Sequence, residues 1–200
     1  MNNLRRPGIT ENFNVDIGLS FYSRIFTIMY WRFGGNLILH KRLNETSEVN
    51  LSYNGMFSVK PELKKFYDDP YQNNLSHQFE LQYKMKGMED IIYMMGIGMG
   101  VMYGYDSADN DNYVVRDYFF QISLLRYMKL EPDLKFYYGM GSFIFIRSNT
   151  RRSGTIFDND TGIGYFPVWV CLFCGLEYKS LLAELDFSNL IPKIGIGIRI

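Results

Sequence analysis

The chain has 200 residues, which fits one domain, and its 21 basic and 21 acidic residues balance, so no excess of positive charge indicates nucleic-acid binding. Mean hydropathy is −0.14, and no apolar stretch reaches the roughly 18 residues that a membrane-spanning helix needs, which excludes a bundle of such helices. Aromatic residues make up 17% of the chain, and such rings favour β-strands and membrane interfaces.

Residues 1–11 form a predicted N-terminal extension, and residues 12–200 form one predicted β-barrel domain. The extension has no apolar core of signal-peptide length, so we expect a mature or trimmed chain. After it, apolar side chains recur at every second position, which is the period of a strand rather than of a helix. We expect about ten strands, with eight possible, at residues 12–23, 34–43, 47–59, 75–87, 90–105, 113–128, 134–147, 165–179, 181–188 and 193–200.

One face of most predicted strands is apolar. Residues 79–86 alternate Phe, Leu, Tyr and Met with Glu, Gln and two Lys, and residues 194–200 alternate Ile with Gly and Arg. Several runs reach about ten residues, the length of a tilted strand that crosses a bilayer. The sequence has no second apolar element to bury these faces, so we expect lipid to cover them. The predicted lipid-facing residues are Phe79, Leu81, Tyr83, Tyr93, Met95, Ile97, Met99, Val101, Ile194, Ile196 and Ile198.

The opposite face is predicted to line the lumen of a closed, antiparallel, up-and-down transmembrane β-barrel. Buried charges are costly unless they pair, so its acids and bases predict an ion-pair network. Barrels of about eight strands are just filled by side chains, and aqueous channels appear near sixteen, so we expect at most a narrow path. Arg126, Tyr137 and Phe143 are expected to fill space beside glycines. The predicted network is Asp16, Glu48, Glu80, Lys84, Lys86, Asp117, Lys135, Arg147, Glu177, Glu184, Asp186 and Arg199, with His40 and Arg42 on the same face.

The predicted connections alternate in length. Short turns at 44–46, 87–89, 130–133 and 179–180 alternate with long segments at 24–33, 60–74, 106–112 and 148–164, and 189–192 is a short exception. Bacterial outer-membrane barrels have short periplasmic turns and longer outer loops. We therefore expect both termini in the periplasm and the long loops outside the cell.

Four segments carry a resemblance to a known family. Residues 134–141 (LKFYYGMG), 166–178, 182–185 (LAEL) and the closing 195–200 (GIGIRI) resemble the porin-family outer membrane β-barrel proteins of Bacteroidota. The resemblance covers roughly residues 12–200 and concerns the strand pattern and the ending. It implies an integral protein of the bacterial outer membrane, in contact with membrane lipid and lipopolysaccharide.

The long segments provide candidates for contact with the outside. Basic and aromatic residues there could meet acidic lipopolysaccharide head groups or glycans: Lys60, Lys64, Lys65, Tyr67, Tyr71, Arg151 and Arg152. We expect a structural or surface-binding role with at most narrow pore activity. Two alternatives stay open. One is a rim enzyme acting on peptide or lipid, with His77 beside Asp68, Asp69 or Glu80 as its base. The other is a soluble ligand-binding barrel, with an apolar inside and a polar outside.

Two further motifs have plain explanations. Cys171 and Cys174 are spaced as a CxxC, but in an extended strand they point to opposite faces and lie about 10 Å apart, beyond disulfide reach. Residues 106–111 and 158–162 are rich in Asp and Asn, which form turns readily and do not match a calcium loop. We therefore expect no catalytic residue, metal or cofactor.

Overall fold

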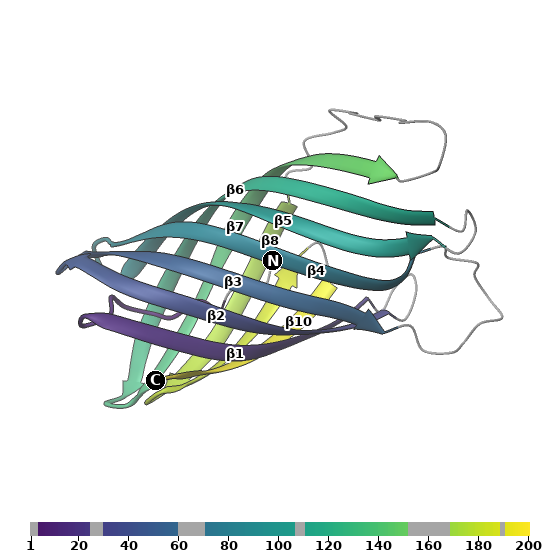
Figure 1. The fold of residues 1–200 in the computed structure, drawn as a ribbon. Coiled ribbons are helices and arrows are strands. Elements are labelled where there is room, and N and C mark those ends of the chain that lie inside the picture. Colours follow the sequence, from purple (N-terminus) through teal and green to yellow (C-terminus); the bar gives the residue numbers. More distant parts are fainter. Residues whose placement is uncertain (1–3, 25–29, 60–70, 107–110, 152–168, 189–190) are drawn as a thin grey trace.

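The computed structural model describes residues 4–24, 30–59, 71–106, 111–151, 169–188 and 191–200. Ten strands in these ranges form one closed antiparallel barrel (Figure 1), in which consecutive strands pair and β1 pairs with β10. The all-β closed barrel with ten strands is therefore confirmed. The strands are β1 (Phe13–Arg24), β2 (Tyr30–Asn44), β3 (Ser47–Val59), β4 (Tyr71–Lys86), β5 (Ile91–Asp106), β6 (Asp111–Glu131), β7 (Leu134–Arg151), β8 (Trp169–Tyr178), β9 (Leu181–Ser188) and β10 (Ile191–Arg199).

Several strands extend further than the alternating pattern predicts at the end where long connections were expected. β7 pairs with β6 as far as Arg151 rather than residue 147, and β4 pairs with β5 from Tyr71 rather than residue 75. β2 begins at Tyr30 rather than at residue 34. Backbone pairing between neighbouring strands needs no apolar face, so the ladder continues where the hydrophobic alternation has ended.

Tight hairpins join the strands at the other end. They lie at 45–46, 87–90, 132–133 and 179–180, on the left in Figure 1, where the C-terminus also lies. Glu89 and Asp90 have φ angles of 54° and 59°, and Lys179 has 53°. Two of the four hairpins thus have left-handed angles, which match the right-handed twist of the flanking strands. We call this the short-turn end of the barrel.

Exposed and buried side chains follow the predicted alternation. Outward-facing Ile97 and Ile196 are 59% and 60% exposed, whereas inward-facing Asp16 and Glu48 are fully buried. The predicted lipid-facing residues are all exposed except Val101, which is half-buried. A soluble ligand-binding barrel would have the reverse arrangement, so the structure does not fit that alternative. Among the described residues, none belongs to a helix long and apolar enough to cross a membrane.

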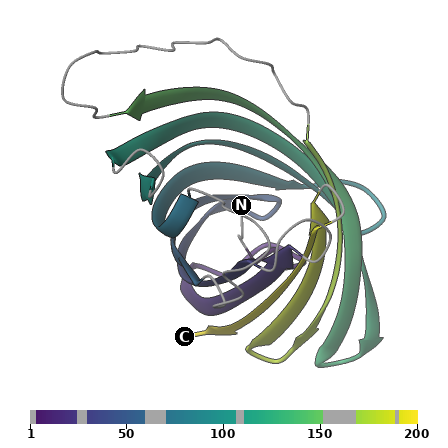
Figure 2. The same ribbon diagram turned by 90° about the vertical axis from the view of Figure 1, so that its right-hand side faces the viewer.

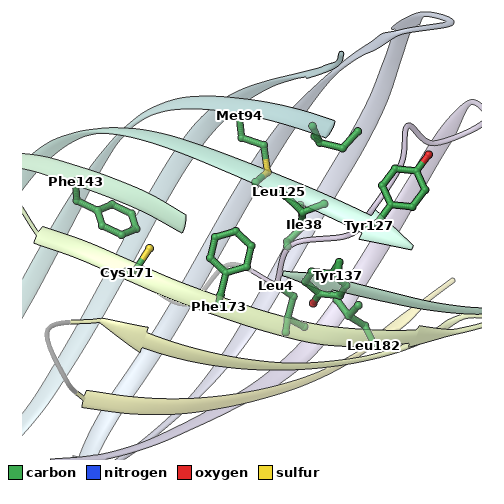
Figure 3. Packing of buried hydrophobic residues seen from close by; sticks show 11 residues of the cluster. Leu4, Ile38, Met94, Leu125, Tyr127, Tyr137, Phe143, Cys171, Phe173 and Leu182 are labelled. Carbon is green, nitrogen blue, oxygen red and sulfur yellow. The ribbon is translucent and has the colours of Figure 1, made fainter. Parts of the chain in front are cut away.

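The interior also holds an apolar cluster, of which only Tyr137 and Phe143 were predicted. Side chains from six strands and from the segment before β1 meet there (Figure 3): Leu4, Ile38, Ile92, Met94, Leu125, Tyr127, Tyr137, Phe143, Cys171, Phe173 and Leu182. Inward positions of a strand need not be charged, because a filled interior can bury apolar groups as a soluble core does. The interior is therefore mixed rather than uniformly polar.

Candidate functional site in the barrel interior

The N-terminal segment enters the barrel. Residues 4–7 are buried and Thr10 is 3% exposed. Figure 2 shows the ring of strands around this segment, viewed nearly along the barrel axis. The segment belongs to none of the ten strands, so side chains and isolated backbone groups attach it to the wall. We call residues 4–10 the inner segment.

The Leu4 side chain packs against three glycines of the barrel wall. A β-carbon built on Gly195 would lie 2.6 Å from Leu4 Cδ2, and one on Gly197 would lie 2.4 Å from Leu4 Cδ1. Gly18 on β1 meets the same side chain. The alternation of Ile and Gly in β10 thus has two causes: the isoleucines face outward, and the glycines leave room for the inner segment.

Asp16 is the centre of a first group of buried charges. Its Oδ2 accepts hydrogen bonds from Arg6 Nε at 2.6 Å and from His40 Nε2 at 2.9 Å, and its Oδ1 accepts one from Arg199 Nε at 3.1 Å. Arg6 also donates from Nη1 to Glu177 Oε1 at 3.2 Å and from Nη2 to the Ser180 carbonyl oxygen at 2.8 Å. Charge-assisted bonds of this kind offset the cost of burying the ions.

Glu48 continues this group across β2, β3 and β4. Lys84 donates from Nζ to Glu48 Oε1 at 3.0 Å, and the Thr10 amide donates to Oε2 at 2.7 Å. His40 Nδ1 lies 3.3 Å from Glu48 Oε1 and 2.9 Å from Asn50 Oδ1. Both ring nitrogens of His40 therefore face acceptor oxygens, and the doubly protonated imidazolium satisfies them all.

Arg5 is the centre of a second group. Its Nη1 lies 2.7 Å from Glu184 Oε1 and 2.9 Å from Asp186 Oδ2, and its guanidinium carbon lies 4.0 Å from the centre of the Phe173 ring. Tyr137 Oη donates to Glu184 Oε2 at 3.0 Å, and so does the Arg5 amide. Burial alone would lower the pKa of Arg5, but Glu184 and Asp186 outweigh burial and raise its pKa above the ordinary value, so Arg5 stays charged.

Little space remains beside the inner segment. The cavity that it shares with the wall has a volume of about 10 Å³. The residues that line it are Leu4, Arg5, Arg6, Ile38, His40, Asn50, Ser52, Gln82, Lys84 and Met94. A single water molecule needs about that volume. Side chains therefore fill this part of the lumen, in line with the expected filled interior.

Most predicted lumen residues lie inside the barrel. Asp16, Glu48, Glu80, Lys84, Glu177, Glu184 and Asp186 are buried, and Asp117, Lys135 and Arg199 are half-buried. Lys135 pairs with Glu177 at 3.6 Å. The side chain of Arg147 is outside the described part of the structure, although its backbone pairs in register with Asp117.

Lys86 and Arg126 differ from the interior prediction, and half-buried Arg42 lies at the edge of the barrel. Lys86 is exposed and lies 3.8 Å from Asp90, because it is the last residue of β4 and the barrel wall ends there. Arg42 is also at this end, where its Nε donates to the Asn44 carbonyl oxygen. Arg126 is exposed: it follows inward-facing Leu125, so the strand period turns it outward. Tyr137 and Phe143 are buried as expected.

The other candidate motifs lie apart from this network. His77 faces outward, and its Nδ1 lies 2.7 Å from Tyr53 Oη among outward aromatic rings. Cys171 is buried and Cys174 half-buried, both with free thiols, on opposite faces of β8. Within the described residues, no group of three or more His, Cys, Asp or Glu side chains is arranged to hold a metal ion.

The outer-loop candidates lie almost wholly outside the described residues. Lys60, Lys64, Lys65, Tyr67 and Arg152 are in the undescribed ranges, as are 107–110 and 158–162 of the acidic segments. Tyr71 and Arg151 are strand ends whose side chains are not described.

The inner segment is what the sequence prediction missed. Leu4, Arg5, Arg6 and Thr10 take part in the interior, yet residues 1–11 were only a predicted extension. A short irregular segment has no periodicity to reveal its environment. The signal that could have found it is charge, because the predicted network of twelve residues holds seven acids and five bases.

The fold and this interior define a class: a closed ten-stranded antiparallel barrel, apolar outside, with buried ion pairs inside. No family model matches the chain, and no curated protein matches it. Among solved structures, the chain is distantly similar to the ferric citrate transporter FecA in its unliganded form, with 10% identity and a TM-score of 0.28 over 90% of this chain. The chain spans 38% of that transporter chain, and no family is assigned.

Proposed function

We propose that this protein is an integral outer-membrane β-barrel with a side-chain-filled lumen, which has a structural or surface-binding role and conducts ions at most weakly. The observation that carries the proposal is the pairing of an exposed apolar wall with buried ion pairs in a closed barrel. In water, such a wall would be an unusually large exposed apolar surface. In a bilayer, lipid covers the wall, and closure leaves no strand edge unpaired.

The placement of the aromatic residues supports a membrane environment. Outward-facing Phe33 and Phe57 stack near the end where the long connections emerge, with ring centroids 5.6 Å apart. Exposed Tyr138 and Tyr178 lie near the short-turn end. Aliphatic side chains such as Ile97 lie between these levels, together with exposed Phe120, which pairs in register with Ile97. Aromatic residues at both ends of an apolar band are typical of outer-membrane barrels.

Heat-modifiable gel mobility tests the membrane barrel. The chain, refolded in detergent, is expected to migrate faster when unheated than after boiling, because a closed barrel stays folded in the gel. An unshifted band, together with ready solubility in the absence of detergent, would contradict the proposal.

Planar-bilayer recording tests the filled lumen. Because the inner segment and the wall leave a cavity of only about 10 Å³ beside Arg5 and Lys84, we expect the inserted wild-type barrel to show little or no conductance. Large, stable, ohmic steps from the wild-type chain would identify an open pore instead.

The long outer loops are the proposed surface-binding part. Two predicted segments combine cations with aromatic rings: Lys60, Lys64, Lys65 and Tyr67 before the start of β4 at Tyr71, and Arg152 after the end of β7 at Arg151. Such groups suit acidic lipopolysaccharide head groups or glycans. Replacement of the three lysines by glutamine is expected to weaken retention on lipopolysaccharide vesicles but not on neutral phospholipid vesicles.

A further inference from the structure

We propose that the pocket around Glu184 and Asp186 is a guanidinium-binding site, which the chain fills with its own Arg5 and which accepts a guanidinium group from solution when Arg5 is removed. The ligand class is a planar cation, either a small guanidinium compound or the arginine side chain of a peptide. The site goes beyond the proposed anchoring and surface-binding role.

All the recognition groups belong to the barrel wall. Glu184 and Asp186 come from β9, Phe173 from β8 and Tyr137 from β7. The Tyr137 hydroxyl bonds to Glu184 at 3.0 Å and so positions that carboxylate independently of Arg5. The pocket is therefore built into the scaffold, and Arg5 is a ligand brought by a segment outside the sheet.

The geometry selects a guanidinium over a rounder cation. Two carboxylates lie 2.7 Å and 2.9 Å from one nitrogen of Arg5, and the aromatic face of Phe173 covers the guanidinium at 4.0 Å. A planar, weakly hydrated cation can stack on the ring and donate hydrogen bonds within its plane. An ammonium group has no plane to stack and is more costly to strip of water.

The charge balance calls for one monovalent cation. Lys193 of β10 lies in register with Asp186. The wall itself therefore supplies one cation for the two acids Glu184 and Asp186. Arg5 supplies the second. Removal of its side chain leaves the two acids with Lys193 alone, so the site can take up a small cation as an alternative to protonating a carboxylate.

The test uses the full-length Arg5→Ala chain, folded in detergent, and measures the temperature at which the fast-migrating folded band is lost. We expect a lower midpoint than in the wild type. Guanidinium chloride, at about 10 mM and far below denaturing strength, is expected to recover about half of the loss by mass action. Equal concentrations of sodium chloride and methylammonium chloride are expected to recover much less. Equal recovery with all three salts, or no recovery with any of them, would contradict the proposed guanidinium-binding site.

Two matched variants locate the effect. In Arg5→Ala/Glu184→Gln the response to guanidinium is expected to disappear, because the pocket has lost a carboxylate. In Arg5→Ala/Glu177→Gln it is expected to remain, because Glu177 contacts Arg6 and Lys135 instead of Arg5. A response that survives the first change would place the binding elsewhere and contradict the proposal.

A conservative variant decides the matter even where Arg5→Ala does not fold. Arg5→Lys keeps the charge, yet we expect it to melt below the wild type, and Phe173→Leu is expected to reduce that difference. An Arg5→Lys barrel as stable as the wild type would overturn guanidinium selectivity. A wild-type chain with no heat-shifted band would instead count against the membrane barrel, so the two failures are distinguishable.

Discussion

At the scale of single residues, the interior stability depends on paired charges. Glu184 accepts hydrogen bonds from Arg5 and Tyr137 and is 7% exposed. Glu184→Gln keeps the shape but removes the charge, so of the two ion pairs described for Arg5 the one with Asp186 remains. We expect the free energy of unfolding, measured by urea titration of tryptophan fluorescence in lipid vesicles, to fall by about 2–3 kcal/mol.

The exposed Glu45 in the turn between β2 and β3 provides the control for Glu184. Glu45→Gln is expected to change the free energy of unfolding by less than about 0.5 kcal/mol. Equal effects of the two substitutions would mean that the buried pairs contribute no more than surface charge.

Two glycines on the inner face of β5 make a second residue-scale test. A β-carbon on Gly98 would lie 2.2 Å from the Phe119 ring and 2.4 Å from the Phe79 carbonyl oxygen, whereas one on Gly100 would approach nothing closer than 3.7 Å. Gly98→Ala is therefore expected to lower the free energy of unfolding by about 1–3 kcal/mol. Gly100→Ala is expected to be neutral or slightly stabilising. Similar values for both would contradict the packing described for Phe119.

The alternation of side chains was predictable residue by residue, because the strand period of two is fixed by backbone geometry. It placed Glu80 and Lys84 inside and Phe79 and Leu81 outside. The partners of the inward groups were not predictable. Arg5 and Glu184 are far apart in the sequence, and no local pattern links an irregular segment to the strand that receives it.

At the scale of elements, each strand needs one face suited to lipid. Ile97 lies midway along β5 and is 59% exposed, whereas Met88 lies in the turn before β5 and is 87% exposed. In lipid vesicles Ile97→Lys is expected to cost about 2–4 kcal/mol of unfolding free energy, and Met88→Lys about 0–1 kcal/mol, because the cost of a charge depends on its depth. Equal costs would mean that β5 does not cross the bilayer.

The existence, order and pairing of the strands followed from the sequence, since short turns fix which neighbours pair. The strand ends at the long-connection side did not, because the ladder between β6 and β7 extends to Tyr113 and Arg151 beyond the apolar pattern. Register in such extensions is set by the strand pairs themselves rather than by burial.

At the scale of the whole molecule, the barrel has two different ends. Interior charges such as Asp16, His40 and Lys84 lie near the short-turn end, whereas Ser20, Asn54 and Gln78 line the other half. The inner segment enters at the short-turn end, because β1 begins there at Phe13. The ion pair of Arg6 with Asp16 and the bond from the Thr10 amide to Glu48 therefore join the inner segment to the wall at the short-turn end.

The proposed orientation of the barrel in the outer membrane can be tested on intact cells. In a background with Cys171 and Cys174 replaced by serine, one variant carries Met88→Cys in a short turn and another carries Asp68→Cys in the predicted long segment 60–74. A membrane-impermeant maleimide is expected to label Asp68→Cys on intact cells, and Met88→Cys only after the outer membrane is opened, because short turns face the periplasm in such barrels. The reverse labelling pattern would mean that the barrel has the opposite orientation, with the inner segment and its charge network at the cell surface.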